Sequence, residues 1–123
     1  MSRDERLPRH ARGLVERGWT QHADARAADD SVVHPCDGRA VSWSLLGALV
    51  AAVEDVAASE GEHDALGQLT RTCILLADIV DTDSLEQWND ARERVRDDVV
   101  AALVRATVDL SGPHDGLPGF RPD

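Results

Sequence analysis

Three tryptophans stand close to amide and carboxyl side chains along the chain, and this combination could line a pocket for a small ligand. An indole offers a large apolar surface and one N–H donor, while a nearby amide or carboxylate can fix the orientation of a bound molecule. The residues of this predicted ligand site are Trp19, Gln21, Trp43, Trp88, Asn89 and Asp90. In an alternative interpretation, the three indoles only fill the junctions between helices.

A second cluster consists of carboxylates that could contact a basic protein surface. Its members are Asp78, Asp81, Asp83 and Glu86. A calcium-binding loop needs oxygen ligands at fixed spacing and a glycine at its sixth position. Counted from Asp81, the fifth position holds Leu85 and the sixth holds Glu86. The pattern therefore favours an acidic patch that binds a partner, or a solvated acidic turn, over a calcium loop.

Other patterns of catalytic or metal-binding residues are incomplete. His34 and Cys36 lie two positions apart, but no second pair of soft ligands completes a zinc site. The chain has no nucleophile-elbow motif, no phosphate-binding glycine loop and no dinucleotide fingerprint. We therefore expect no metal and no cofactor, and we assign no catalytic residue. The sequence leaves enzymatic activity undecided and favours a protein that is not an enzyme.

The charge of the chain restricts its partners. Its 123 residues carry 13 basic and 23 acidic side chains, for a formal net charge of −10. The stretch 54–90 contains Arg71 as its one basic residue. A phosphate backbone would be repelled by such a surface, which disfavours direct nucleic-acid binding. No apolar run is long enough to span a membrane. A basic protein surface remains the expected partner, and a homodimer stays open.

The hydrophobic periodicity predicts the elements that position these groups. Apolar residues recur every three or four positions in four stretches, as in helices with one buried face. The expected helices are Asp4–Arg17, Ala40–Ser59, Glu62–Val80 and Ala91–Leu110. Turn-forming residues dominate 20–39, which we interpret as a long ordered loop between the first two helices. One further helical turn is expected near Ser84–Trp88.

Details of the last two long helices follow from the same pattern. Leu66 and Ile74 fall on the predicted buried stripe of the third helix, and Gln68 falls on its outward side. In the fourth helix, Val95 falls on the buried stripe. Asp90 and Glu93, three residues apart, match a capping box at its start.

The size of the chain and its helical pattern together indicate the fold class. We expect an all-α protein, with a compact four-helix domain over residues 1–110. Residues 111–123 are rich in glycine and proline and predict a flexible C-terminal tail. The N-terminus lacks the apolar core of a secretion signal, so a cytoplasmic location is expected.

Three short motifs occur in order along the chain: Arg17–Gln21 (RGWTQ), Ala40–Leu49 (AVSWSLLGAL) and Trp88–Asp90 (WND). From about Leu14 to Leu110 the chain resembles domain-of-unknown-function family 6197, small proteins of actinobacteria and their phages. Members often carry cysteine at the position of Ser44 and a Pro-Gly-Thr stretch after the Asn-Asp pair, and this chain has neither. The resemblance implies no activity, but it points to the six residues of the predicted ligand site.

These observations lead to three functional hypotheses. The first is a non-enzymatic binding or regulatory module whose acidic patch contacts a protein partner. The second is a small-molecule-binding protein, or a small enzyme, with a pocket lined by the tryptophans. The third and weaker one is a nucleic-acid mimic that occupies a DNA-binding protein.

Overall fold

The computed structural model describes residues 5–111, and within them the chain is mostly helical, as predicted. Its elements are α1 (Arg6–Arg17), β1 (Ala25–Ala27), β2 (Ala40–Trp43), α2 (Leu45–Glu60), α3 (Glu62–Ile79), α4 (Leu85–Asn89) and α5 (Arg96–Ser111). This part of the chain has five helices, of which α4 corresponds to the helical turn expected near Ser84–Trp88, and a pair of strands that the periodicity did not predict. The predicted tail lies, apart from Ser111, outside the described residues. No helix within 5–111 is both long and apolar enough to cross a membrane.

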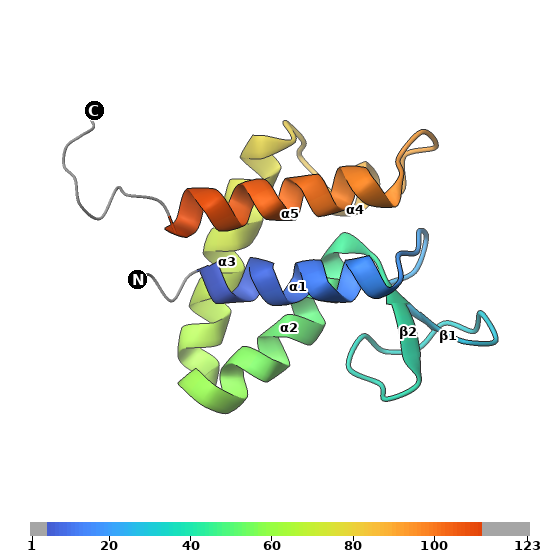
Figure 1. Ribbon diagram of the computed structural model, residues 1–123, viewed down its shortest axis with the longest axis horizontal. Coiled ribbons are helices and arrows are strands. Elements are labelled where there is room, and N and C mark those ends of the chain that lie inside the picture. Colours follow the sequence, from blue (N-terminus) through green and yellow to red (C-terminus); the bar gives the residue numbers. More distant parts are fainter. Residues whose placement is uncertain (1–4, 112–123) are drawn as a thin grey trace.

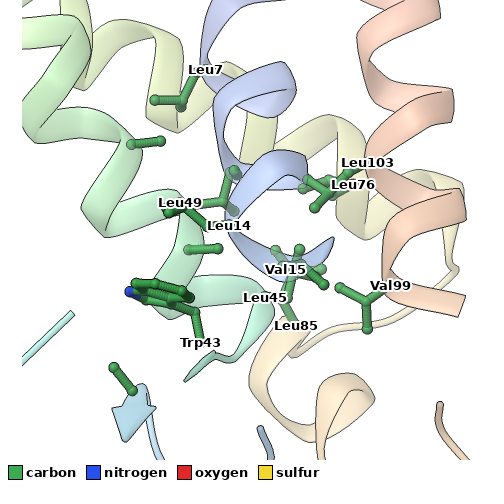
Figure 2. Close-up of a cluster of buried hydrophobic side chains, with 14 of the residues drawn as sticks. Leu7, Leu14, Val15, Trp43, Leu45, Leu49, Leu76, Leu85, Val99 and Leu103 are labelled. Carbon is green, nitrogen blue, oxygen red and sulfur yellow. The ribbon is translucent and has the colours of Figure 1, made fainter. Parts of the chain in front are cut away.

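The long helices pack around one hydrophobic core. Figure 1 shows α1 and α5 side by side, running in opposite directions. Helix α1 also packs against α2, and α2 packs against α3. The side chains that meet between them are mainly leucine and valine (Figure 2), with Leu7 and Val15 from α1, Leu49 from α2, Leu76 from α3 and Leu103 from α5. Burial of these apolar side chains is the main force that holds the helices together.

A two-stranded antiparallel sheet replaces the first turn of the second predicted helix. Trp43 pairs with Ala25, and a bulge follows Arg26. The prediction of a helix from Ala40, without paired strands, is therefore wrong over 40–43. The reason is tertiary: β2 gains hydrogen bonds from two segments distant in sequence, with Ala25–Ala27 on one edge and Trp19 bridged on the other. Strands as short as these depend on such pairing more than on their own residue pattern.

Helix α2 begins at Leu45, where Ser44 takes over the role of N-cap. The Ser44 hydroxyl accepts a hydrogen bond from the backbone N–H of Gly47 at 3.0 Å. This satisfies one of the free N–H groups that every helix start presents. Gly61, with φ of 94°, ends α2 and separates it from α3.

Helix α5 begins later than the sequence predicts, at Arg96 instead of Ala91. The capping-box prediction is wrong because Asp90 ends α4, and its carboxylate accepts from the backbone N–H of His22 at 2.9 Å. At the observed start of α5, the backbone N–H of Val95 donates a hydrogen bond to the Asp98 carboxylate at 3.2 Å. Val95 is thus outside the helix and 54% exposed, and it does not join the buried stripe.

Helix α3 differs from the prediction at Leu66, Gln68 and Ile74. Its buried stripe is Ala65, Gln68, Thr72 and Leu76. Gln68, expected to face outward, is buried, whereas Leu66 and Ile74, expected in the core, are exposed. Gln68 can lie inside because its side-chain amide donates a hydrogen bond to Glu60 Oε1 at 2.8 Å.

Candidate functional site

Asn89, the last residue of α4, lies at the centre of the predicted ligand site and is 1% exposed. Its side-chain oxygen accepts from the indole N–H of Trp19 at 2.8 Å and from the backbone N–H of Leu45 at 3.0 Å. Its side-chain nitrogen donates to Thr20 O at 3.2 Å and to Asp90 Oδ1 at 3.0 Å. An asparagine side chain can form about four hydrogen bonds, so this amide is saturated by the protein itself.

Gln21 adds hydrogen bonds to the same junction, which joins the segment after α1 to the end of α4. Its side-chain nitrogen donates to the carbonyl oxygens of Asn89 and Ala91, each at 2.9 Å. His22 and Asp90 add a backbone contact and, when the imidazole is protonated, an ion pair at 3.7 Å. The segment after α1 is therefore fastened to the segment after α4 by the polar groups of Gln21, Asn89 and Asp90.

The other two tryptophans do not converge on this junction. The Trp43 indole is buried in the core (Figure 2), and its N–H donates to Pro35 O at 3.0 Å. The Trp88 ring is covered by the Arg94 guanidinium, 4.1 Å from the ring centroid. Arg94 also donates to Trp88 O at 2.9 Å. Each indole thus has its own set of contacts.

Two glycines in the sequence motifs, Gly18 and Gly47, stand where a larger residue would not fit. A Cβ on Gly18 would collide with the Val41 carbonyl oxygen, and a Cβ on Gly47 would collide with the Asp24 carbonyl oxygen. Both glycines allow close backbone approach where the loop meets β2 and α2. The RGWTQ and AVSWSLLGAL motifs therefore encode a structural junction.

One open depression borders the predicted ligand site. It has a volume of about 430 Å³ and is lined by Trp19, Val95, Arg96 and Asp97. Of the six residues of the predicted ligand site, Trp19 alone lines it. The structure thus brings Trp19, Gln21, Asn89 and Asp90 together through hydrogen bonds, and leaves Trp43 and Trp88 apart from that network.

The acidic patch lies on the turn between α3 and α4. We call Asp78, Asp81, Asp83 and Glu86 the acidic turn, and all four residues are exposed. Asp81 has φ of 55°, and the Ser84 hydroxyl caps α4 by accepting from Gln87 N at 3.2 Å. Within residues 5–111, no arginine or histidine forms an ion pair with any of the four carboxylates.

The electrostatics of the acidic turn are unfavourable within the protein. Asp78 lies in the last turn of α3 and Asp81 follows its end. The C-terminus of a helix carries partial negative charge, so carboxylates there are repelled, typically by about 0.3–1 kcal/mol each. Elsewhere on the helices, arginines and carboxylates four residues apart form ion pairs, as in Arg12–Glu16 and Arg105–Asp109.

The two thiols are poor candidates for nucleophiles. Burial and the adjacent Glu54 carboxylate raise the pKa of the Cys36 thiol. Burial also raises the pKa of Cys73. A reactive cysteine needs its pKa lowered, since the thiolate is the nucleophile. His34 uses its Nδ1 to accept from the backbone N–H of Cys36 at 3.0 Å. Among residues 5–111, no three histidine, cysteine or acidic side chains are arranged to hold a metal ion.

The outer face of α3 is the surface that sequence reasoning missed. Leu66 and Ile74 fit a helical apolar stripe, but the stripe that faces the core runs through Ala65, Gln68, Thr72 and Leu76. Only the positions of the neighbouring helices decide between the two stripes. The sequence signal that could have raised the question is the surplus of large apolar residues on α3.

Comparison with known proteins identifies a family for the chain without an activity. A family model described as "Family of unknown function (DUF6197)" matches residues 3–109. No curated protein and no solved structure matches the chain. The matched residues include the junction around Asn89 and the acidic turn.

Proposed function

Because the chain belongs to DUF6197, a family of unknown function, we propose its role from its own surface chemistry. The protein is a non-enzymatic binding or regulatory module of the cytoplasm. Its acidic turn contacts a basic surface on a protein partner. The partner contributes arginine or lysine side chains, and neither a membrane nor a nucleic acid is contacted directly.

The observation that carries this proposal is the uncompensated charge of the acidic turn. Four exposed carboxylates gather on one turn without an ion-pair partner among the described residues, and two of them oppose the dipole of α3. Places where a protein departs from favourable local electrostatics are often functional. A basic partner would remove the repulsion, and long-range attraction would speed its association.

The alternative of an active site built from the tryptophan motifs has less support. The side-chain amide of Asn89 is saturated, and Gln21 donates to two carbonyl oxygens. Their polar groups explain how the fold is held together. The raised pKa of each thiol also argues against either cysteine as a nucleophile.

The experiment compares two variants with the same change in net charge. One variant neutralises the acidic turn through Asp78→Asn, Asp81→Asn, Asp83→Asn and Glu86→Gln. The matched control neutralises Asp24, Asp30, Glu93 and Asp97, which are exposed elsewhere on the surface. Binding of a nona-arginine peptide is measured by isothermal titration calorimetry between low and physiological salt.

We expect the acidic-turn variant to bind the peptide about tenfold more weakly than the wild type at low salt, because several exposed ion pairs of a few tenths of a kcal/mol each are lost. The control variant should lose much less affinity, and salt should weaken the wild type most. Equal losses in the two variants would mean that only net charge attracts the peptide, and this would refute the proposed site.

The depression beside Trp19 supports a second candidate function, the binding of a small molecule. Its volume of about 430 Å³ is within the range of ligand sites. A metabolite screen that shifts Trp19 fluorescence in the wild type but not in Trp19→Phe would support this function. A screen without such a ligand would leave Trp19 with its structural role alone.

A further inference from the structure

Helix α3 exposes two of its large aliphatic side chains and buries two polar ones. Ile74 is 66% exposed and Leu66 is 48% exposed. On the opposite side, the core-facing stripe includes Gln68 and Thr72, which are 2% and 0% exposed. A surface helix of a globular protein usually buries its apolar side chains and exposes its polar ones, since apolar side chains gain most from leaving water. This arrangement indicates that the outer face of α3 has a use outside the fold.

The polar residues on the inner side are incompletely satisfied. Gln68 donates to Glu60 Oε1, but its own side-chain oxygen and the Thr72 hydroxyl have no hydrogen-bond partner. Leaving buried polar atoms without partners is unfavourable. The chain therefore tolerates a cost in its core while it keeps Leu66 and Ile74 at the surface, which is a departure typical of functional surfaces.

The exposed apolar residues are continuous with the acidic turn. Leu66, Thr70, Ile74 and Asp78 follow one another at intervals of four residues, so each neighbours the next along the helix surface. Between the apolar pair, the Thr70 hydroxyl donates to Leu66 O at 3.1 Å, which leaves the threonine methyl group free to pack. From Leu66 to Asp78 this surface is about 18 Å long, at 1.5 Å per residue.

We propose that this surface docks an amphipathic helix of a partner protein. The apolar face of that helix packs on Leu66 and Ile74, and basic residues at one of its ends meet the acidic turn. The inference rests on the proposed function and adds the form of the partner. A row of side chains four residues apart forms a ridge that fits into a groove of a second helix. Apolar anchors would supply most of the affinity, and the charges would supply orientation.

A second copy of the chain fits this surface less well. An antiparallel pair of α3 helices that places Leu66 against Ile74 would also place Glu62 against Asp78. A parallel pair would place Asp78 against Asp78. Like charges facing each other oppose association, so the charge pattern favours a basic partner over self-association.

The test uses two synthetic peptides of identical composition and the full chain. The patterned peptide has leucines at intervals of three and four residues and three arginines in its last turn, and the scrambled peptide has no apolar stripe. The site variant is Leu66→Ser with Ile74→Ser. The control is Val108→Ser, which removes an equally exposed apolar side chain from α5. Circular dichroism checks that both variants fold.

We expect the wild type to bind the patterned peptide at least about tenfold more tightly than the scrambled one, as a few apolar anchors typically provide. The double serine variant should lose this preference and Val108→Ser should keep it. The acidic-turn variant should weaken both peptides by a similar factor. Amide chemical shifts should map the patterned peptide to Leu66, Ile74 and the acidic turn.

Four outcomes would overturn the inference. Equal binding of both peptides with continued dependence on the acidic turn would refute the helix-docking surface and leave the proposed function standing. Peptide binding that is unchanged in the acidic-turn variant would refute both the helix-docking surface and the proposed function. A wild-type dimer in sedimentation equilibrium that Ile74→Ser dissociates, or peptide affinity that rises tenfold when residues 112–123 are removed, would assign the surface to the chain itself.

Discussion

The indole N–H of Trp19 donates a hydrogen bond of 2.8 Å to the side-chain oxygen of Asn89, which lies 70 residues further along the chain. The same oxygen accepts from the backbone of Leu45, so one amide joins the segment after α1, the start of α2 and the end of α4. These contacts give the RGWTQ, AVSWSLLGAL and WND motifs a structural role. The surface of α3 and the acidic turn are left as the candidates for a binding function.

Loss of the Asn89 side chain should destabilise the protein strongly. Asn89→Ala leaves the buried N–H groups of Trp19 and Leu45 without their acceptor, and we expect the free energy of unfolding to fall by about 2–4 kcal/mol. Urea denaturation measures this loss. Gln87→Ala, at an exposed position on the same helix, should change stability by less than about 0.5 kcal/mol. Equal losses of stability in the two variants would contradict the role of the Asn89 side chain in joining these segments.

Two glycine-to-alanine changes should act in opposite directions. At Gly47 a methyl group would collide with the Asp24 carbonyl oxygen, so Gly47→Ala should destabilise by more than about 1 kcal/mol despite the better helix propensity of alanine. At Gly13 the methyl group would meet no atom within 4 Å. Gly13→Ala should therefore stabilise by about 0.5–1 kcal/mol. Thermal unfolding measures both, and the same sign for both would refute the close contact at Gly47.

Charge removal from the acidic turn should raise stability while it weakens binding. Asp78→Asn and Asp81→Asn each remove a carboxylate from the negative end of α3, and each should add about 0.3–1 kcal/mol at low salt. Asparagine also tolerates the positive φ of residue 81. Glu86 lies in the first turn of α4, where a carboxylate is favourable, so Glu86→Gln should lower stability slightly. Melting curves in low and high salt test this, and a common sign for all three would contradict it.

The reactivity of Cys36 should depend on Glu54. Burial and the Glu54 carboxylate raise the pKa of this thiol, so Glu54→Gln should lower the pKa and increase the thiolate fraction at pH 8. We expect faster alkylation of Cys36 by iodoacetamide, followed by peptide mass spectrometry. Cys73 is an internal control because burial alone raises its pKa. Acceleration at both thiols would indicate a loosened fold and would contradict the local effect.

Much of the helical framework is predictable from hydrophobic periodicity, because spacing of three and four residues reports directly on a buried helix face. This holds for α1 and for the part of α2 that follows Leu45. The strand at Ala40–Trp43 is not predictable in this way, since its partner at Ala25–Ala27 has three residues, none of them β-branched or aromatic. The orientation of α3 also depends on its neighbours, because its core-facing stripe includes Gln68 and Thr72 and is therefore not marked by apolar residues alone.

The candidate site was predictable in its membership more than in its chemistry. The motifs group Trp19, Gln21, Asn89 and Asp90, and these residues do contact one another. The sequence alone does not show that their polar atoms bond among themselves, since that depends on the path of the loop between α1 and β2. Asp90 illustrates the difference: it fits a helix cap by spacing, yet its carboxylate accepts from the backbone of His22.

Chemical-shift mapping with the nona-arginine peptide tests the central claim most directly. In titrations of the isotope-labelled wild type, the account predicts that the largest amide shifts fall on Asp78, Asp81, Asp83 and Glu86 and decrease as salt screens the contact. The matched control variant should show the same map. Shifts that centre on Trp19 and Arg96, or that spread evenly over the exposed carboxylates, would contradict the assignment of the acidic turn as the binding surface.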